Sequence, residues 1–145
     1  MANYVLIHGA WHTGEFLEET AIPIKSSGHK VYLPTVAGNR PGDSKSVGLV
    51  EAIQSIVDYI NENNISDVIL LGHSYGGMII TGVADKIPDR IHRLIYWNAF
   101  VPDKWYPKCI LISSHNLKNR MVRLSFLSRS GERPLLMMLI LNLPG

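Results

Sequence analysis

Residues 72–76 read Gly-His-Ser-Tyr-Gly, which places Ser74 at the centre of a G-x-S-x-G pattern. The apolar run 68–71 precedes this pattern, and a helix-compatible run follows it. A buried strand, a tight turn and a helix in this order hold a serine hydroxyl at the tip of the turn, where it can attack a carbonyl carbon. Ser74 is therefore the candidate nucleophile.

The two glycines of this pattern carry a steric prediction. A Cβ atom at Gly72 or Gly76 would strike the neighbouring backbone, and we expect Ser74 itself to have an unfavourable backbone conformation. The helix after the turn points its N-terminus at Ser74, where free N–H groups stabilise developing negative charge. The alternative interpretation is a glycine-rich strand-to-helix turn whose serine has no catalytic role.

Hydrophobic periodicity predicts four strands separated by helices. We expect strands at 3–8, 29–33, 67–71 and 93–100, and helices at 15–27, 46–63 and 75–87. The helix at 46–63 is the clearest, because its apolar residues recur at the spacing of one helix face. Strands that alternate with helices predict an α/β fold with a doubly wound parallel sheet.

Four segments of the chain resemble the α/β-hydrolase fold family. They read Y-V-L-I-H-G-A-W-H, S-G-H-K-V, G-H-S-Y-G-G and R-L-I-Y-W-N-A-F-V-P-D, and the resemblance covers residues 3–103. Within the family they resemble the branch of plant-type methyl esterases and hydroxynitrile lyases, together with bacterial esterases. The resemblance implies hydrolysis of carboxylic esters through a Ser-His-Asp triad, with no metal and no organic cofactor.

Such a site needs N–H donors for the oxyanion of the acyl intermediate. The backbone N–H of Tyr75, at the start of the helix, is one candidate. By resemblance to the H-G loop of the family, the backbone N–H of Ala10 is the other, and Gly9 permits the close turn that aims it. We expect the side chains of His8 and His73 to support these turns through hydrogen bonds rather than to carry protons.

Gly9 also bears on the type of reaction. The resemblance implies that lyases of this branch have a hydroxyl-bearing threonine here, which holds the cyanohydrin. A glycine leaves space for an ester and its water, so esterase is favoured over hydroxynitrile lyase. Trp11 and Tyr75 are candidates for lining an apolar pocket, whereas Trp97 lies on a predicted strand and is expected in the core.

The acid and the base of a triad follow the serine along the chain in this fold. The histidines after Ser74 are His92 and His115. His92 precedes a predicted strand, at the end of the sheet opposite to Ser74. Asp103 follows that strand on its carboxyl side, so Asp103 and His115 are the candidate acid and base.

The composition changes near residue 104. Residues 1–103 contain seven Lys and Arg and eleven Asp and Glu, whereas residues 104–145 contain seven Lys and Arg and one acidic residue, Glu132. We therefore divide the chain into a hydrolase core at 1–103 and an anomalous basic tail at 104–145 without strand-helix alternation. Synonymous codons for residues 128–144 can be chosen so that a reading frame shifted by two nucleotides encodes a different segment. That segment resembles the cap region of this esterase branch. We hypothesise that the coding frame shifts near residue 104 and that the chain is truncated.

On this hypothesis the chain is an incomplete N-terminal half of the fold, with an exposed sheet edge beside its fourth strand. Without the triad acid and base, Ser74 keeps the weak nucleophilicity of an ordinary hydroxyl, and the chain is expected to hydrolyse esters slowly or not at all. Three interpretations stay open: a serine carboxylesterase, a hydroxynitrile lyase, and a non-catalytic small-molecule binding protein or non-functional fragment.

The 145 residues suffice for one domain, and a hydrophobic content of 46% with a mean hydropathy of +0.08 predicts a soluble globular protein. No run reaches the ~20 apolar residues of a membrane span. No signal peptide is evident, and the single cysteine cannot form an internal disulfide. We expect a cytoplasmic protein that binds a small-molecule ester, with neither nucleic acid nor membrane as a partner. The sequence gives no indication of the oligomeric state.

Overall fold

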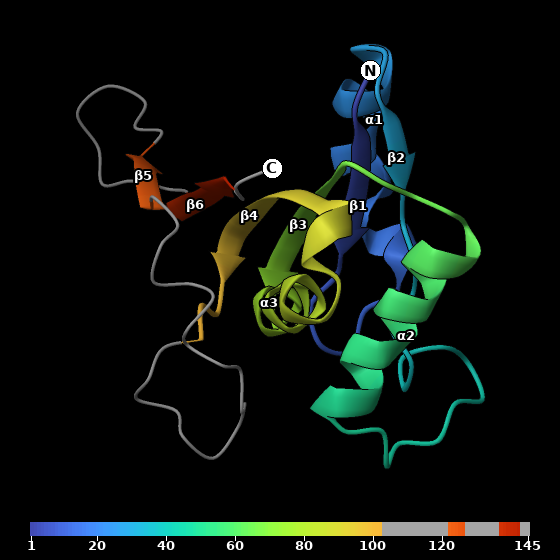
Figure 1. Ribbon diagram of the computed structural model, residues 1–145. Helices are drawn as coiled ribbons and strands as arrows, with labels where there is room; N and C mark the ends of the chain where they lie inside the picture. Colours follow the sequence, from blue (N-terminus) through green and yellow to red (C-terminus); the bar gives the residue numbers. More distant parts are fainter. Residues whose placement is uncertain (103–121, 127–136, 143–145) are drawn as a thin grey trace.

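The structure, a computed structural model, describes residues 1–102, 122–126 and 137–142, the last two ranges through their backbone (Figure 1). Its elements are β1 (Asn3–Ile7), η1 (Gly14–Leu17), α1 (Glu18–Ser26), β2 (Lys30–Tyr32), α2 (Leu49–Glu62), β3 (Val68–Ser74), α3 (Gly76–Lys86), η2 (Pro88–Arg90), β4 (Ile91–Ala99), β5 (Val122–Phe126) and β6 (Met137–Asn142). The seven strands and helices predicted within residues 1–100 are all present. Their ends lie within a few residues of the predicted ends.

Six strands form one sheet in the order β2-β1-β3-β4-β6-β5. The first four are parallel neighbours, which confirms the α/β class and the parallel sheet. β6 pairs antiparallel with β4, and β5 pairs antiparallel with β6. The prediction of an exposed edge beside β4 is therefore wrong. Unpaired backbone N–H and C=O groups accept any extended segment within reach, and the tail supplies two.

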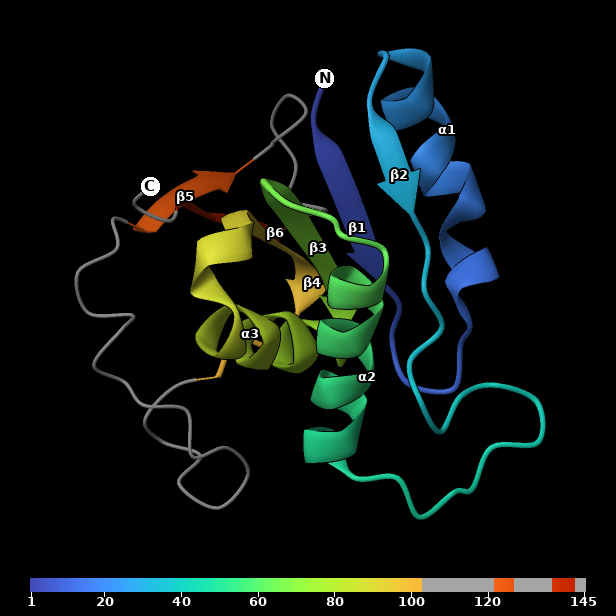
Figure 2. The same cartoon turned by 45° about the vertical axis from the view of Figure 1, so that its right-hand side comes forward.

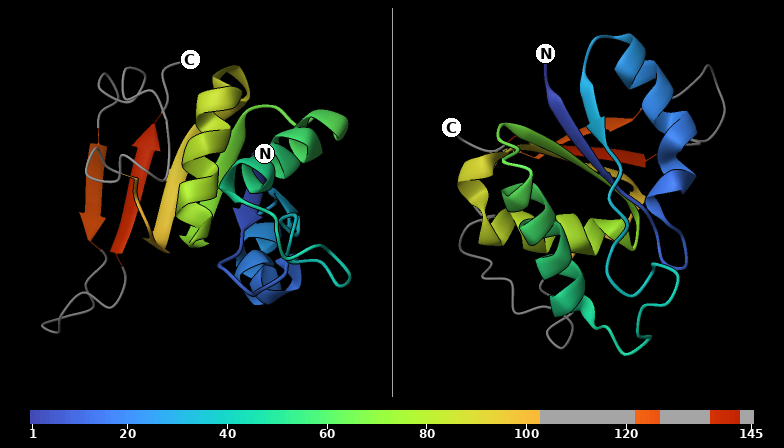
Figure 3. Two further views of the ribbon diagram at one scale, coloured as in Figure 1. Left: turned by 90° about the horizontal axis from the view of Figure 1, so that it is seen from below. Right: turned by 90° about the vertical axis from the view of Figure 1, so that its right-hand side faces the viewer.

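Helices cover both faces of the parallel strands, with α2 and α3 on one face and α1 on the other (Figures 2 and 3). Successive side chains of a strand point to opposite faces. Accordingly, Val5 and Ile7 of β1 pack in the cluster beneath α2 and α3, whereas Leu6 packs in the cluster with Leu17 and Ala21. This alternation is the physical basis of the doubly wound arrangement.

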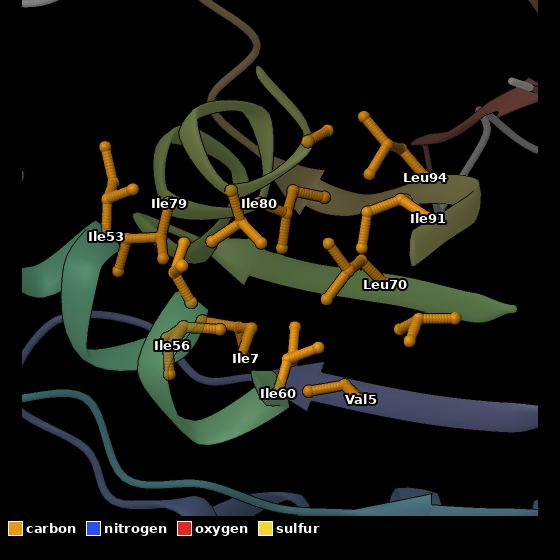
Figure 4. Close-up of a cluster of buried hydrophobic side chains, with 14 of the residues drawn as sticks. Val5, Ile7, Ile53, Ile56, Ile60, Leu70, Ile79, Ile80, Ile91 and Leu94 are labelled. Carbon is orange, nitrogen blue, oxygen red and sulfur yellow. The ribbon is translucent and has the colours of Figure 1, made fainter. Parts of the chain in front are cut away.

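The larger cluster holds the junction of β3 and α3 in place (Figure 4). Full burial of one aliphatic side chain stabilises the fold by about 1.5–3 kcal/mol. The buried residues that Figure 4 labels come from three strands and two helices: Val5, Ile7, Ile53, Ile56, Ile60, Leu70, Ile79, Ile80, Ile91 and Leu94. The predicted apolar face of α2 is thus confirmed as the face that packs on the sheet.

A buried polar pair links α3 to β4. The Thr81 hydroxyl donates to the carbonyl of Gly77 at 2.7 Å, and it accepts from the Tyr96 hydroxyl, also at 2.7 Å. Burial raises the pKa of Tyr96 to about 12, so the phenol stays protonated and remains a donor. The pair fixes the first turns of α3 against the centre of the sheet.

We expect Thr81→Val to destabilise the protein more than Tyr96→Phe. Tyr96→Phe removes one hydrogen bond, a loss of about 1 kcal/mol, and leaves the Thr81 hydroxyl bonded to Gly77. Thr81→Val instead leaves a buried phenol hydroxyl without its partner, which costs about 1–3 kcal/mol. Urea denaturation of both variants and of the double variant measures the difference. The reverse order of stability would contradict this account of the pair.

Candidate active site

Ser74 lies at a tight corner between strand and helix. It is the last residue of β3, and α3 begins at Gly76, so Tyr75 alone separates the two elements. The φ angle of Ser74 is +54°, in the left-handed region that side chains other than glycine rarely adopt. Such strain costs of the order of 1–3 kcal/mol and persists only where the surroundings impose it. The strained backbone that the sequence predicts at Ser74 is present.

The glycines around Ser74 allow backbone to approach backbone. A Cβ atom at Gly72 would lie 2.6 Å from the carbonyl oxygen of Gly76, and one at Gly76 would lie 2.6 Å from that of Ile7. Both distances are shorter than real Cβ contacts, which confirms the steric prediction. Gly77 also has no room for a Cβ atom, because the carbonyl of Phe100 lies against it. This constraint was not predicted, although the Gly76-Gly77 pair in the sequence indicates close backbone packing.

The loop after β1 lies directly against this corner. The backbone N–H of His12 donates to the carbonyl of Gly9 at 3.4 Å, which closes a four-residue turn. A Cβ atom at Gly9 would lie 3.2 Å from the Cβ of Ser74 and 3.4 Å from Nδ1 of His73. Gly9 is therefore the position through which the two turns touch.

Two backbone N–H groups lie in these facing turns. Within residues 1–102, neither the N–H of Ala10 nor that of Tyr75 donates a hydrogen bond to a backbone carbonyl outside the regular elements or to a side chain. Ala10 and Tyr75 also line one cavity. The residues of the two predicted oxyanion donors thus belong to neighbouring turns and line the same cavity.

His8 ties the turn after β1 to the loop after β2. Its side chain is 1% exposed, Nδ1 donates to the carbonyl of Gly9 at 2.8 Å, and Nε2 accepts from the N–H of Val36 at 3.0 Å. Desolvation by burial lowers the pKa of His8, so the ring is neutral with its proton on Nδ1. Both nitrogens are occupied, which agrees with the predicted supporting role.

His73 behaves differently from the prediction. Its Nδ1 atom is buried and has no hydrogen-bond partner among the described residues. The ring instead packs against aromatic rings, with centroid distances of 4.9 Å to Trp97 and 6.1 Å to Phe16. Trp97 is its register partner on β4, a contact between distant residues that local sequence does not reveal. Burial lowers the pKa of His73, so this ring is also neutral.

A cavity of about 500 Å³ opens beside the corner. Trp11 and Tyr75 line it, as predicted, and Trp97 is absent from the lining residues that the structure describes. Most of its wall is aliphatic or backbone, and Asn39 and Lys45 are the polar side chains that the sequence analysis missed. Lys45 donates to the carbonyl of Gly38 at 2.9 Å, which folds the loop after β2 over the cavity.

The candidate acid and base, Asp103 and His115, lie outside the described residues. The Ser74 hydroxyl has no hydrogen-bond partner in the part of the chain that the structure describes. In that same part, no group of three or more His, Cys, Asp or Glu residues could hold a metal ion, and no helix is long and apolar enough to cross a membrane. Among the described residues, Ser74 therefore lies at a tight corner against the turn at Gly9, and Ala10 and Tyr75 of these two turns line one cavity.

Comparison with known proteins adds independent information. Residues 4–142 match the Alpha/beta hydrolase family. The chain is 45% identical over 106 residues to the carbendazim hydrolyzing esterase of Nocardioides sp. (strain SG-4G), covering 71% of this chain and 44% of that protein. It is 33% identical over 111 residues to the alpha-hydroxynitrile lyase of Arabidopsis thaliana, and this match covers 70% of this chain and 41% of that protein.

Solved structures agree. An extracellular alpha/beta-hydrolase from a Paenibacillus species, described as a structural and functional homologue of tobacco salicylic acid binding protein 2, superimposes with a TM-score of 0.69 at 42% identity. The match covers 71% of this chain and 43% of that one. The chain thus spans less than half the length of each of these three relatives.

We expect the free energy of unfolding to fall as the pH decreases from about 7.5 to about 5.5. His8 and His73 have folded-state pKa values below the ordinary 6.5, so the unfolded chain binds more protons below that pH. The two histidines contribute fully to the free energy of unfolding above pH 6.5, and this contribution is lost as the pH falls toward their folded-state pKa values. Urea denaturation at the two pH values measures the loss.

The variant His8→Gln separates this effect from general destabilisation. It should be less stable at about pH 7.5 by about 1–3 kcal/mol, because glutamine has no donor in the position of Nδ1 and the carbonyl of Gly9 loses its buried hydrogen bond. It should also lose less stability on acidification than the unchanged chain. Thr81→Val is the matched control, because it lowers stability without removing a titrating group. An equal pH dependence in both variants would contradict the assignment to His8.

Proposed function

Because the chain belongs to the Alpha/beta hydrolase family, we propose that it is a serine esterase in which the Ser74 hydroxyl attacks a small-molecule carboxylic ester. The observation that carries the proposal is the conformation of Ser74, with a φ angle of +54° between β3 and α3. A strained serine at a strand-to-helix corner, enclosed by glycines without room for a Cβ atom, is the arrangement of a nucleophile elbow.

The proposed reaction proceeds through an acyl-enzyme. Ser74 Oγ bonds to the carbonyl carbon while its proton passes to a base, and the carbonyl oxygen becomes an oxyanion. The N–H groups of Ala10 and Tyr75 donate to this oxyanion, and the loss of one such donor costs about 3–4 kcal/mol of barrier. The alcohol then leaves with a proton, and water releases the acid by the reverse sequence. His115 and Asp103 are the proposed base and its orienting acid.

The proposed substrates are small esters with an apolar body. The cavity that Tyr75, the residue after Ser74, helps to line has aliphatic and aromatic walls together with the polar side chains of Asn39 and Lys45, which supports an ester with an apolar acyl or alkoxy group. The similarity to an esterase named for carbendazim supports the same class of reaction. Lyase activity is disfavoured, because Gly9 offers no hydroxyl to hold a cyanohydrin at the turn that touches Ser74.

We expect slow hydrolysis of 4-nitrophenyl acetate by the purified chain and its complete loss in Ser74→Ala. The rate is slow if no base reaches Ser74, because an unassisted hydroxyl is a weak nucleophile. His115→Gln tests the base, since a further loss of rate in this variant assigns the proton transfer to His115. Intact mass spectrometry should detect one acetyl group on the unchanged chain and none on Ser74→Ala. A rate equal to buffer, or an undiminished rate in Ser74→Ala, would overturn the proposal.

Gly9→Thr tests the choice between esterase and lyase. We expect the variant to hydrolyse the ester about fivefold to 150-fold more slowly, because overpacking of this kind costs about 1–3 kcal/mol at the two turns. Cyanide release from mandelonitrile by the unchanged chain should not exceed the buffer rate. Measurable release that depends on Ser74 would favour a hydroxynitrile lyase, and binding of either compound without turnover would favour a binding protein.

A further inference from the structure

The carbonyl of the peptide group between Gly9 and Ala10 accepts two hydrogen bonds. Nδ1 of the His8 ring lies 2.8 Å from the Gly9 oxygen, and the backbone N–H of His12 donates to the same oxygen at 3.4 Å. A carbonyl oxygen has two lone pairs, so both acceptor positions are used. The peptide group is planar and trans, so its N–H, which belongs to Ala10, points opposite to its carbonyl. The two bonds at the Gly9 oxygen therefore fix the direction of the Ala10 N–H.

The His8 ring, which makes the shorter of these two bonds, is held by a second loop. Its Nε2 atom accepts from the N–H of Val36 at 3.0 Å, and both residues are almost completely buried. Nε2 must carry a lone pair to accept this bond, which places the ring proton on Nδ1, the nitrogen that faces the Gly9 carbonyl. Val36 therefore fixes both the orientation of the His8 ring and the position of its proton.

The local conformational preferences of the turn from Gly9 to His12 do not favour this geometry. Gly9 has no Cβ atom, so the peptide group that follows it can rotate with little steric hindrance. Trp11, the third residue of the turn, has a φ angle of +62°, which side chains other than glycine rarely adopt. The direction of the Ala10 N–H consequently depends on hydrogen bonds from outside its own peptide group, and the His8 ring supplies the shorter one.

We propose that His8 is a positioning residue, whose Nδ1 proton holds the Gly9 carbonyl so that the N–H of Ala10 keeps the direction needed to donate to the oxyanion. The effect on rate rests on the proposed function, in which Ala10 is one of the two donors. A donor that is already oriented needs no reorganisation when charge develops, and complete loss of such a donor slows acyl transfer about a hundredfold to a thousandfold. A donor that is free to rotate should lose part of this factor.

Two substitutions of His8 separate the two hydrogen bonds of its ring. The amide nitrogen of asparagine takes the place of Nδ1, so His8→Asn keeps a donor for the Gly9 carbonyl and removes the acceptor of Val36. The amide oxygen of glutamine takes the place of Nε2, so His8→Gln keeps this acceptor and removes the donor. Each variant loses one buried hydrogen bond, so both should unfold at a similar, lower urea concentration than the unchanged chain. A difference in rate between them then reports the bond to Gly9 and not stability.

We expect His8→Gln to be acylated at Ser74 about tenfold to a hundredfold more slowly at saturating 4-nitrophenyl acetate, measured as 4-nitrophenolate release in the first turnover. The apparent affinity for the ester should change little, because the oxyanion exists only after attack. His8→Asn should recover most of the rate. Ile60→Val, in the buried face of α2, is the control for destabilisation and should leave the rate unchanged. Equal rates in the two His8 variants would overturn the inference, because a ring that only supports the loops gives that result.

NMR measurements separate this inference from the proposed function. On the unchanged chain at about pH 7.5, the ¹⁵N shifts of the His8 ring should show a proton on Nδ1 and none on Nε2, and the opposite tautomer would overturn the inference without any variant. The order parameter of the Ala10 amide should be about 0.85 in the unchanged chain and in His8→Asn, and fall toward about 0.6 in His8→Gln. A value that stays high in His8→Gln refutes the inference, even where the ester is hydrolysed. A fall in His8→Gln, in a chain without Ser74-dependent acylation, supports the inference and refutes the esterase.

Discussion

The close approach of three backbone segments around the start of α3 is the constraint on which the site depends. The carbonyl of Ile7 at the end of β1 approaches Gly76, and the carbonyl of Phe100 after β4 approaches Gly77, with no space for a Cβ atom at either glycine. The corner at Ser74 can therefore form only when α3 lies tight against β1, β3 and β4. Burial of aliphatic side chains between α2, α3 and the sheet supplies the free energy that offsets the strain at Ser74.

The titratable side chains around the corner at Ser74 are kept neutral by burial. His8 and His73 are both neutral because burial lowers their pKa values, and neither supplies a positive charge next to Ser74. Backbone N–H groups do not titrate, so in the proposed mechanism they supply the polar stabilisation of the anion at any pH. The phenol of Tyr96 is kept neutral by burial as well, so the interior near the elbow carries hydrogen bonds rather than charges.

Much of this could be predicted from the sequence, because the information was local. The apolar face of α2, the alternation of helices with strands, and the steric need for Gly72 and Gly76 follow from residues close together in the chain. Contacts between distant residues were missed. The packing of His73 on Trp97 depends on strand register, and the partners of Tyr96 and Val36 lie across the fold. The pairing of β6 with β4 likewise had no signal in the periodicity of either segment.

The helix that presents the elbow has a composition with consequences for folding. α3 contains Gly76, Gly77 and Gly82, and each glycine inside a helix is about 1 kcal/mol less favourable than alanine. Gly82 is fixed by its neighbour, since a Cβ atom there would overlap the side chain of Ile53 on α2. Such a helix has little tendency to form alone and acquires its shape by docking. The left-handed conformation of Ser74 next to this helix therefore depends on the docking of α3 against α2 and the sheet.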